Sequence, residues 1–293
     1  MKNMKWLATA LLATVVLVGC GASKPAAETK NNTTAAAEQN TAAEKTTNDA
    51  GGAQEDDLAR IQASGVIRVG TEGTFSPRTY HDESDKLVGY DVEVAAAIAE
   101  KLGVKAEFIE TNWDSIVAGM DADKFDIIAS DMTPTEERRE KFDFSDSYSF
   151  IHRQLVVHKD NDTIKTFEDL KGHTVATEVS STSASIAERY GASVTPVQGA
   201  ESANEMVLSH RSDAMILPET TIATMLKVNP DLKLKAVDTL SETEEAAIPV
   251  RKGQTRLLEA INKALAELES EGKLTEISNK YFNVDVSSDS EKK

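Results

Sequence analysis

The chain has 293 residues, which is enough for one large or two ordinary domains. It carries 49 acidic and 32 basic side chains, a net charge of −17, and an acidic surface repels phosphate backbones, so nucleic-acid binding is not expected. A single cysteine, Cys20, excludes an intramolecular disulfide. The five histidines are scattered without ligand spacing, so we expect neither a metal nor another cofactor.

The first residues have the pattern of an export signal. Lys2 and Lys5 precede an unbroken apolar run from Trp6 to Val18, which as a helix would span roughly 20 Å and falls short of a membrane core. The run ends in "LVGC", which resembles the lipobox of bacterial lipoproteins; an ordinary signal peptide with an incidental cysteine is the alternative. The resemblance implies cleavage after residue 19 and a lipid anchor on Cys20 at the cell membrane, outside the cytoplasm.

Both ends of the chain are expected to be irregular. Residues 20–57 are rich in Ala, Thr, Asn, Glu and Lys and cannot bury enough apolar surface to offset the entropy of ordering, so they predict a disordered tether. The tail at 285–293, which contains "SSDSEKK", is expected to be frayed.

Strand and helix patterns alternate through the rest of the chain. Alternation of this kind favours parallel sheets covered by helices. The first part predicts strands at 65–70, 105–110 and 125–130 and helices at 89–104 and 113–120. The second part predicts strands at 171–178, 192–197 and 212–217 and helices at 181–191, 200–210 and 218–228.

Two extended segments are expected to connect these two α/β units. The segment 144–159 is long and polar-aromatic, and the strand at 246–250 precedes two closing helices, 255–272 and 273–282. If both segments cross between the units, they form a hinge with a ligand cleft between the units. We therefore expect an α/β fold of two lobes, with the first lobe at 58–149 and 247–284 and the second at 150–246.

The body of the chain resembles the extracytoplasmic solute-binding proteins of the polar amino-acid type, which are receptors of ABC importers. The resemblance covers nearly all of residues 65–282. It rests on the opening stretch 66–120, on "FDIIASDMTPTEERREKFDFSDSY" with its Thr-x-x-Arg and Phe-Ser-x-x-Tyr, on "IKTFEDLKGHTVAT" and on "LLEAINKALAELESEGKLTEISNKYF". "GTEGT" followed by "YHD" favours the cystine-type branch.

This resemblance implies a fold and a mode of action. The fold is the two-lobe periplasmic-binding-protein type II, with two strands as a hinge and a cleft that closes on one free amino acid. The partners would be that amino acid and the membrane subunits of an ABC importer, and the protein would act as a monomer. Binding can drive closure only if the ligand binds the closed state more tightly.

Arg138 is the candidate for gripping the ligand. In the family, the arginine of Thr-x-x-Arg holds the α-carboxylate through a bidentate, charge-assisted pair, and by position this is Arg138. The residue lies in the first turn of a predicted helix, where acids suit the helix dipole and a cation does not unless it holds an anion. A surface salt bridge to Glu136 or Glu140 is the alternative.

Three hydroxyl residues match family positions that hydrogen-bond the ligand. Ser130 and Thr133 follow a strand end, and Thr182 begins a helix whose free N–H groups would face the cleft. Plain helix capping is the alternative for each of them.

Side chains on the pocket walls are also implied. Trp113 and Phe75 match aromatic walls that could sandwich an aliphatic or cationic ligand side chain, with ordinary core packing as the alternative. Glu72 could meet a ligand side chain or ammonium group, or it could be a solvated loop acid.

Three positions depart from the family pattern, and Asp131, Arg78 and Glu219 are candidate site residues on account of them. Asp131 stands where a small neutral residue is usual, and Arg78 where an aromatic is usual. Pro218 replaces the aspartate that binds the ligand's α-ammonium group, and Glu219 beside it could substitute. A carboxylate beside Arg138 would partly neutralise it. Asp131 could point away, pair with Arg78, or take over the ammonium contact, which is the hypothesis we favour.

The main functional expectation is a binding protein without covalent chemistry. No catalytic triad, Cys-His pair or phosphate-binding loop is visible in the sequence. One alternative is a dehydratase on the same fold that uses a cleft acid such as Glu72, Asp131 or Glu219. Another is a tethered sensor or adhesin with an altered pocket, because the three departures also permit a ligand that is not a standard α-amino acid.

Overall fold

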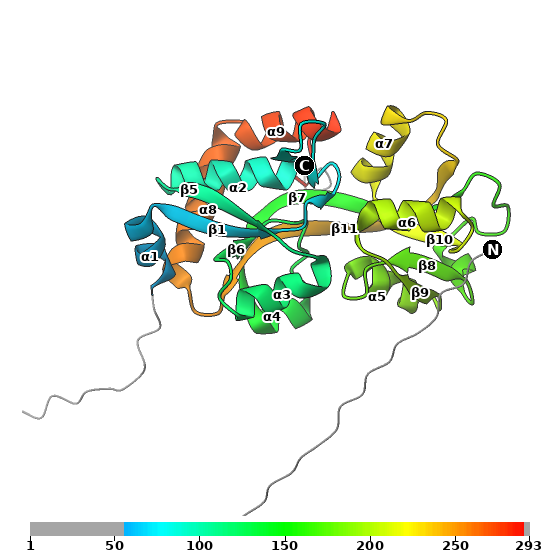
Figure 1. Ribbon diagram of the computed structural model, residues 1–293, viewed down its shortest axis with the longest axis horizontal. Coiled ribbons are helices and arrows are strands. Elements are labelled where there is room, and N and C mark those ends of the chain that lie inside the picture. The colour runs from blue at the N-terminus through cyan, green and yellow to red at the C-terminus, as the bar shows by residue number, and fades with distance from the viewer. Residues whose placement is uncertain (1–55, 290–293) are drawn as a thin grey trace, which may run out of the picture. The chain divides into compact units, whose positions relative to one another are not determined.

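The computed structural model describes residues 56–289 (Figure 1). The expected export signal, the lipidation of Cys20 and the tether up to residue 55 lie outside the described residues. Within the described part, no helix combines the length and the apolar character needed to cross a membrane.

A small parallel sheet organises the first lobe. Its strand order is β5-β1-β6, formed by Lys105–Glu110, Val66–Thr71 and Ile127–Ile128. The helices α1 (Asp57–Ser64), α2 (Tyr90–Lys101) and α3 (Trp113–Asp121) contact β1. A short antiparallel sheet of β2 (Thr74–Phe75), β3 (Thr79–His81) and β4 (Leu87–Val88) lies between β1 and α2 in the sequence.

Helix α2 is bounded by two glycines with positive φ, Gly89 at 136° and Gly103 at 75°. A Cβ on Gly89 would lie 2.0 Å from the carbonyl oxygen of Arg78, so only glycine permits this close approach. Val94, Ala95 and Ile98 form part of the buried face of the helix, at helical spacing.

The closing helices complete the first lobe. Helices α8 (Thr255–Ser270) and α9 (Lys273–Phe282) pack against α2 and share one apolar core with it. The prediction of a frayed tail at 285–293 is wrong for its first residues. Val286 and Ser287 are buried, and the backbone oxygen of Val286 accepts a hydrogen bond from the backbone N–H of Phe150 at 2.8 Å. Burial of Val286 and the hydrogen bonds of its backbone to Phe150 and Ser278 hold this first part of the tail against the lobe.

The second lobe is built on a five-stranded sheet in the order β11-β7-β10-β8-β9. Strands β8 (Thr174–Thr177), β9 (Ser193–Pro196) and β10 (Ala214–Pro218) belong wholly to this lobe. The short helix η1 (Phe167–Leu170) and helices α5 (Thr182–Arg189), α6 (Gly199–Leu208) and α7 (Glu219–Val228) accompany them. Two apolar clusters hold this lobe together, one of which includes Val156, Met215 and Ile222.

Two long strands join the lobes. Strand β7 (Phe142–His158) follows the short helix α4 (Glu136–Lys141), and β11 (Leu234–Arg251) pairs with β7 in antiparallel register along almost its whole length (Figure 1). One end of each strand belongs to the second sheet. Near the other end Tyr148 and Ile248 join the core of the first lobe. The result is the expected α/β fold of two lobes with two connecting strands.

Strand β11 begins at Leu234, twelve residues before the expected strand at 246–250. Its first half is rich in Asp, Glu and Thr and is mostly half-buried or exposed, so it lacks an apolar run that the sequence could reveal. Backbone pairing with β7 makes this half a strand.

Candidate ligand-binding site

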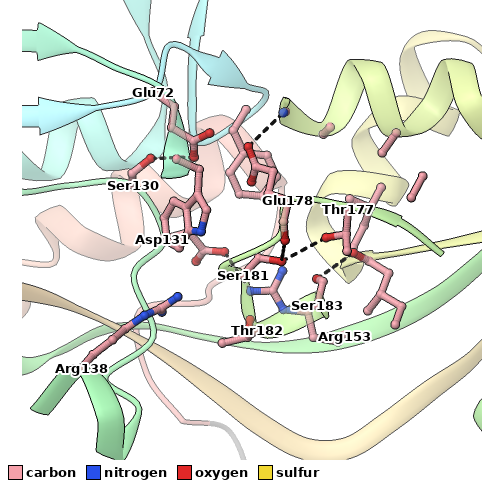
Figure 2. Close-up of a pocket in the computed structure, with 18 residues that line it drawn as sticks. Glu72, Ser130, Asp131, Arg138, Arg153, Thr177, Glu178, Ser181, Thr182 and Ser183 are labelled. Carbon is pink, nitrogen blue, oxygen red and sulfur yellow. Dashed lines mark hydrogen bonds and ion pairs between the residues drawn. The ribbon is translucent and has the colours of Figure 1, made fainter. Parts of the chain in front are cut away.

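A cavity of about 550 Å³, open space at its mouth included, lies between the lobes (Figure 2). Charged and hydroxyl side chains from both lobes and from β7 converge on it. The described residues contain no group of three or more His, Cys, Asp or Glu side chains that could hold a metal ion. The cavity is lined by Glu72, Phe75, Trp113, Ser130, Asp131, Arg138, Arg153, Ala176, Thr177, Glu178, Ser181, Thr182, Ser183, Gly199, Ala200, Ala203, Ile216 and Leu217.

Arg138 faces the cavity from helix α4. The Thr135 side chain caps this helix by accepting the backbone N–H of Arg138 at 3.3 Å. The guanidinium donates to two backbone carbonyls, of Thr133 at 2.9 Å and of Ser180 at 3.0 Å, and it lies 5.1 Å from the ring centre of Trp113. Within residues 56–289 no carboxylate lies within ion-pair distance of it. Burial lowers the pKa of Arg138. This guanidinium is therefore available to bind an anion.

Asp131 follows the small-residue end of β6 and adopts the left-handed conformation, with φ at 50°. Its backbone N–H donates to Asp91 at 2.7 Å, which stabilises this unusual backbone. Its carboxylate lies 3.0 Å from the guanidinium of Arg78 and 3.5 Å from that of Arg153. Asp131 therefore faces the cavity while its charge is shared by two arginines.

Arg78 does not line the cavity. Its side chain is fully buried in the first lobe, and it contacts Asp91 at 3.5 Å, Asp131 at 3.0 Å and the Ser149 hydroxyl at 3.0 Å. Aromatic rings lie on two sides, with ring centres 5.4 Å away for Tyr90 and 5.1 Å away for Phe282. Arg78 is thus the internal counter-charge of two carboxylates, behind the cavity wall.

Glu72 and Glu178 form a carboxyl pair across the cavity, Glu72 from the end of β1 and Glu178 from the end of β8. Burial raises the pKa of Glu72 well above its usual range, and the neighbouring Glu178 raises it further. Burial also raises the pKa of Glu178. Ser130 donates to Glu72 at 3.1 Å and the Gly199 backbone N–H donates to Glu178 at 2.9 Å. The raised pKa values favour protonation of this carboxyl pair, and of Glu72 more strongly than of Glu178.

The second-lobe wall is the N-terminus of α5. Ser181 caps this helix by accepting the backbone N–H of Ala184 at 3.1 Å. The hydroxyl of Thr182 donates to Glu244 of β11 at 3.3 Å, and the hydroxyl of Thr133 donates to the same carboxylate oxygen at 3.3 Å. Thr133 itself is outside the lining of the cavity.

The cavity brings together seven of the ten residues predicted to bind ligand. The seven are Glu72, Phe75, Trp113, Ser130, Asp131, Arg138 and Thr182. It does not include the other three, which are Arg78, Thr133 and Glu219. The Glu219 carboxylate accepts the backbone N–H of His152 at 3.3 Å and lines a different cavity, because its place at the start of α7 turns it away from the cleft.

Two charged residues of the cavity, Arg153 and Glu178, were not predicted from the sequence. Arg153 stands on β7 between His152 and Gln154, and it is buried. Glu178 ends the run "TVATE", three residues before Ser181, the cap of helix α5. The sequence signal for Arg153 was a charge inside a predicted extended segment, and the signal for Glu178 was an acid at the end of a predicted strand.

Two lobes joined by two strands, with a polar cavity between them, define a solute-binding protein of the two-lobe class. The chain belongs to the bacterial extracellular solute-binding proteins, family 3, which it matches over residues 67–284.

Relatives and solved structures of similar proteins agree with this assignment. The chain is 39% identical over 230 residues to the L-cystine-binding protein TcyA of Bacillus subtilis, covering 78% of this chain and 85% of that protein. An ancestral arginine-binding protein bound to arginine superimposes with a TM-score of 0.70 at 40% identity, covering 74% of this chain and 98% of that one. The L-cystine solute receptor of Neisseria gonorrhoeae in its unliganded open conformation superimposes with a TM-score of 0.55 at 38% identity. The match covers 79% of this chain and 99% of that one.

Proposed function

We propose that the protein is a lipid-anchored extracytoplasmic receptor that captures one free amino acid in the cavity and delivers it to an ABC importer. The observation that carries the proposal is Arg138, a half-buried guanidinium over an aromatic ring with no carboxylate partner in the described part of the chain. A ligand carboxylate would supply the missing charge through a bidentate pair.

The rest of the cavity is suited to the other groups of an amino acid. Asp131 supplies a carboxylate near Arg138 that can face an α-ammonium group, as the sequence hypothesis requires, although Arg78 and Arg153 share its charge. The carboxyl pair of Glu72 and Glu178 adds two acceptors for a second ammonium or a guanidinium group. Phe75 and Trp113 supply apolar surface on the walls.

The nature of the ligand follows from these groups and from the relatives. Cystine carries two ammonium and two carboxylate groups, and arginine carries a distal guanidinium. Relatives and neighbours of the chain bind one or the other. We propose cystine as the first candidate and a basic amino acid as the second. We assign no covalent step to the cleft acids.

The proposed mode of action requires that the protein be anchored at the membrane. We propose that Cys20 carries the lipid anchor and that the segment between Cys20 and helix α1 connects it to the two lobes. A monomer in this position would present its closed form to the importer's membrane subunits. Metabolic labelling with a palmitate analogue should mark the wild type and leave Cys20→Ser unlabelled. Equal labelling would contradict the anchor.

Thermal unfolding against a panel of free amino acids tests the proposed ligand class. A true ligand at a hundred times its dissociation constant should add about 2.7 kcal/mol to the free energy of unfolding. We expect L-cystine or a basic amino acid to raise the melting temperature, and the matching amine without its α-carboxylate to leave it unchanged. The absence of any shift across the panel would contradict the proposal.

A further inference from the structure

One carboxylate oxygen of Glu244 is the meeting point of donors from three parts of the fold. Arg153 of β7 donates through Nε at 2.8 Å, Thr133 of the first lobe donates at 3.3 Å, and Thr182 of the second lobe donates at 3.3 Å. Arg138 is a further positive charge that faces Glu244, beyond ion-pair distance. Two hydroxyls and two guanidinium groups around one carboxylate constitute an anion-binding site.

The two hydroxyls cannot serve two carboxylates at the same time. A threonine hydroxyl has a single proton, and an ionised carboxylate only accepts hydrogen bonds. If Thr133 and Thr182 donate to Glu244, neither can donate to a ligand carboxylate. A ligand that uses these hydroxyls therefore requires Glu244 to give them up.

Glu244 also connects the lobes. It lies on β11, opposite Ile151 of β7, and so belongs to the pair of joining strands. Its hydrogen bonds to Thr133 and Thr182 tie a loop of the first lobe to the start of α5 in the second. Together with the donation from Arg138 to Ser180, they link the two lobes across the cavity.

We infer that Glu244 is an internal competitor for the ligand's α-carboxylate: in the free protein it occupies the hydroxyl and guanidinium donors of the cleft, and it must leave them when an amino acid binds. The part of the inference that concerns ligand binding rests on the proposed function. Under this inference, Glu244 of β11 helps to set the affinity for the ligand. The family motif around Arg138 does not include this residue.

The side chain can make this exchange. Its exposed fraction is 17%, so a rotation toward solvent is open to it. Arg153 would keep Asp131, 3.5 Å away, as a partner after Glu244 leaves. The arriving carboxylate would then meet two hydroxyls with free protons and the guanidinium of Arg138.

Titration of L-cystine and L-arginine into the wild type and into Glu244→Gln tests the competition. If Glu244 occupies the donors about nine-tenths of the time, its removal should tighten binding about tenfold, because only the unoccupied state accepts ligand. Glu242→Gln is the matched control, since it removes the same charge from the same strand at a side chain that is 63% exposed. The control should leave the affinity unchanged. Unchanged or weaker binding by Glu244→Gln would overturn the inference.

X-ray scattering without ligand supplies a test that does not need the ligand to be known. Loss of the Glu244 bridge should open the lobes, so ligand-free Glu244→Gln should have a larger radius of gyration than the wild type and Glu242→Gln. Equal radii would overturn the inference. If the wild type binds no amino acid, the proposed function fails, and the scattering result alone decides the role of Glu244.

Discussion

At the scale of single residues, the cleft holds two arginines in opposite situations. Arg78 is completely buried and meets two carboxylates, Asp91 and Asp131, so its charge is satisfied inside the first lobe. Arg138 donates to two carbonyl oxygens and lies over an aromatic ring, and no carboxylate of residues 56–289 lies within ion-pair distance of it. The first arrangement makes Arg78 part of the lobe's structure, and the second leaves Arg138 available for a ligand.

Replacement of Arg78 by Met should destabilise the protein by about 3–5 kcal/mol, because it leaves two buried carboxylates without their counter-charge. Urea denaturation followed by circular dichroism measures this loss. Arg139→Met is the control, since Arg139 is exposed and its loss should cost little. A loss below about 1 kcal/mol for Arg78→Met would show that Asp91 and Asp131 do not depend on Arg78.

The carboxyl pair predicts a pH dependence. The native state keeps the proton of Glu72 after the unfolded chain has released it near its ordinary pKa of about 4.3. The free energy of unfolding should therefore fall as the pH rises above that value, until the raised native pKa is passed. Asp131 and Asp114 add negative charge around the pair and act in the same direction.

Glu72→Gln should reduce the fall of the free energy of unfolding with rising pH, because the amide is neutral at every pH and can still donate to Glu178. Denaturation at a series of pH values from 4 to 8 should give a shallower decline than in the wild type. The control is Glu107→Gln, an exposed position on β5. A slope identical to that of the wild type would mean that the pair holds no proton in this range.

At the scale of elements, the site depends on short segments with well-defined starts. Helix α4 has six residues and no buried side chain, so its position rests on the Thr135 cap and on the following strand β7. Since Arg138 lies in its first turn, the cap also orients the guanidinium. Sequence reasoning found this helix start from "TPTEER", because capping is a local property.

Loss of the cap in Thr135→Ala should cost about 1 kcal/mol and weaken amino-acid binding, because Arg138 loses its fixed direction. Thr135→Ser keeps a capping hydroxyl and should restore both stability and affinity. Denaturation and calorimetric titration of the two variants check this expectation. Equal affinity in Thr135→Ala and in the wild type would show that the carbonyl contacts alone position Arg138.

Elements whose definition is not local were harder to predict. Helix α2, with its apolar spacing and its glycine stop, follows from the sequence. The first half of β11 does not, since it becomes a strand only through pairing with β7. Glu244 lies in the part of β11 before residue 246, which the sequence did not predict as a strand, and Arg153 lies on the partner strand. To predict the contact between Glu244 and Arg153, one must know the pairing register of two segments about ninety residues apart in the sequence.

At the scale of the whole molecule, the alternation of strands and helices and the family motifs predicted the two lobes and the two joining strands. They also predicted most of the cavity's first-lobe wall, where the residues follow β1 and β6 in the sequence. They did not predict the charges on the second lobe and on β7. Those side chains acquire their roles only when the lobes face each other, and the roles of all these residues in binding stay predictions.

The central claim is that Arg138 grips the α-carboxylate of a free amino acid. Calorimetric titration of the wild type, Arg138→Lys and the exposed control Arg139→Lys with the amino acid that gives the largest thermal shift tests it most directly. Lysine cannot form the bidentate pair, so Arg138→Lys should bind at least tenfold more weakly, a loss of about 1.4 kcal/mol or more, while the control binds as the wild type does. Equal affinity of Arg138→Lys and the wild type would contradict the account.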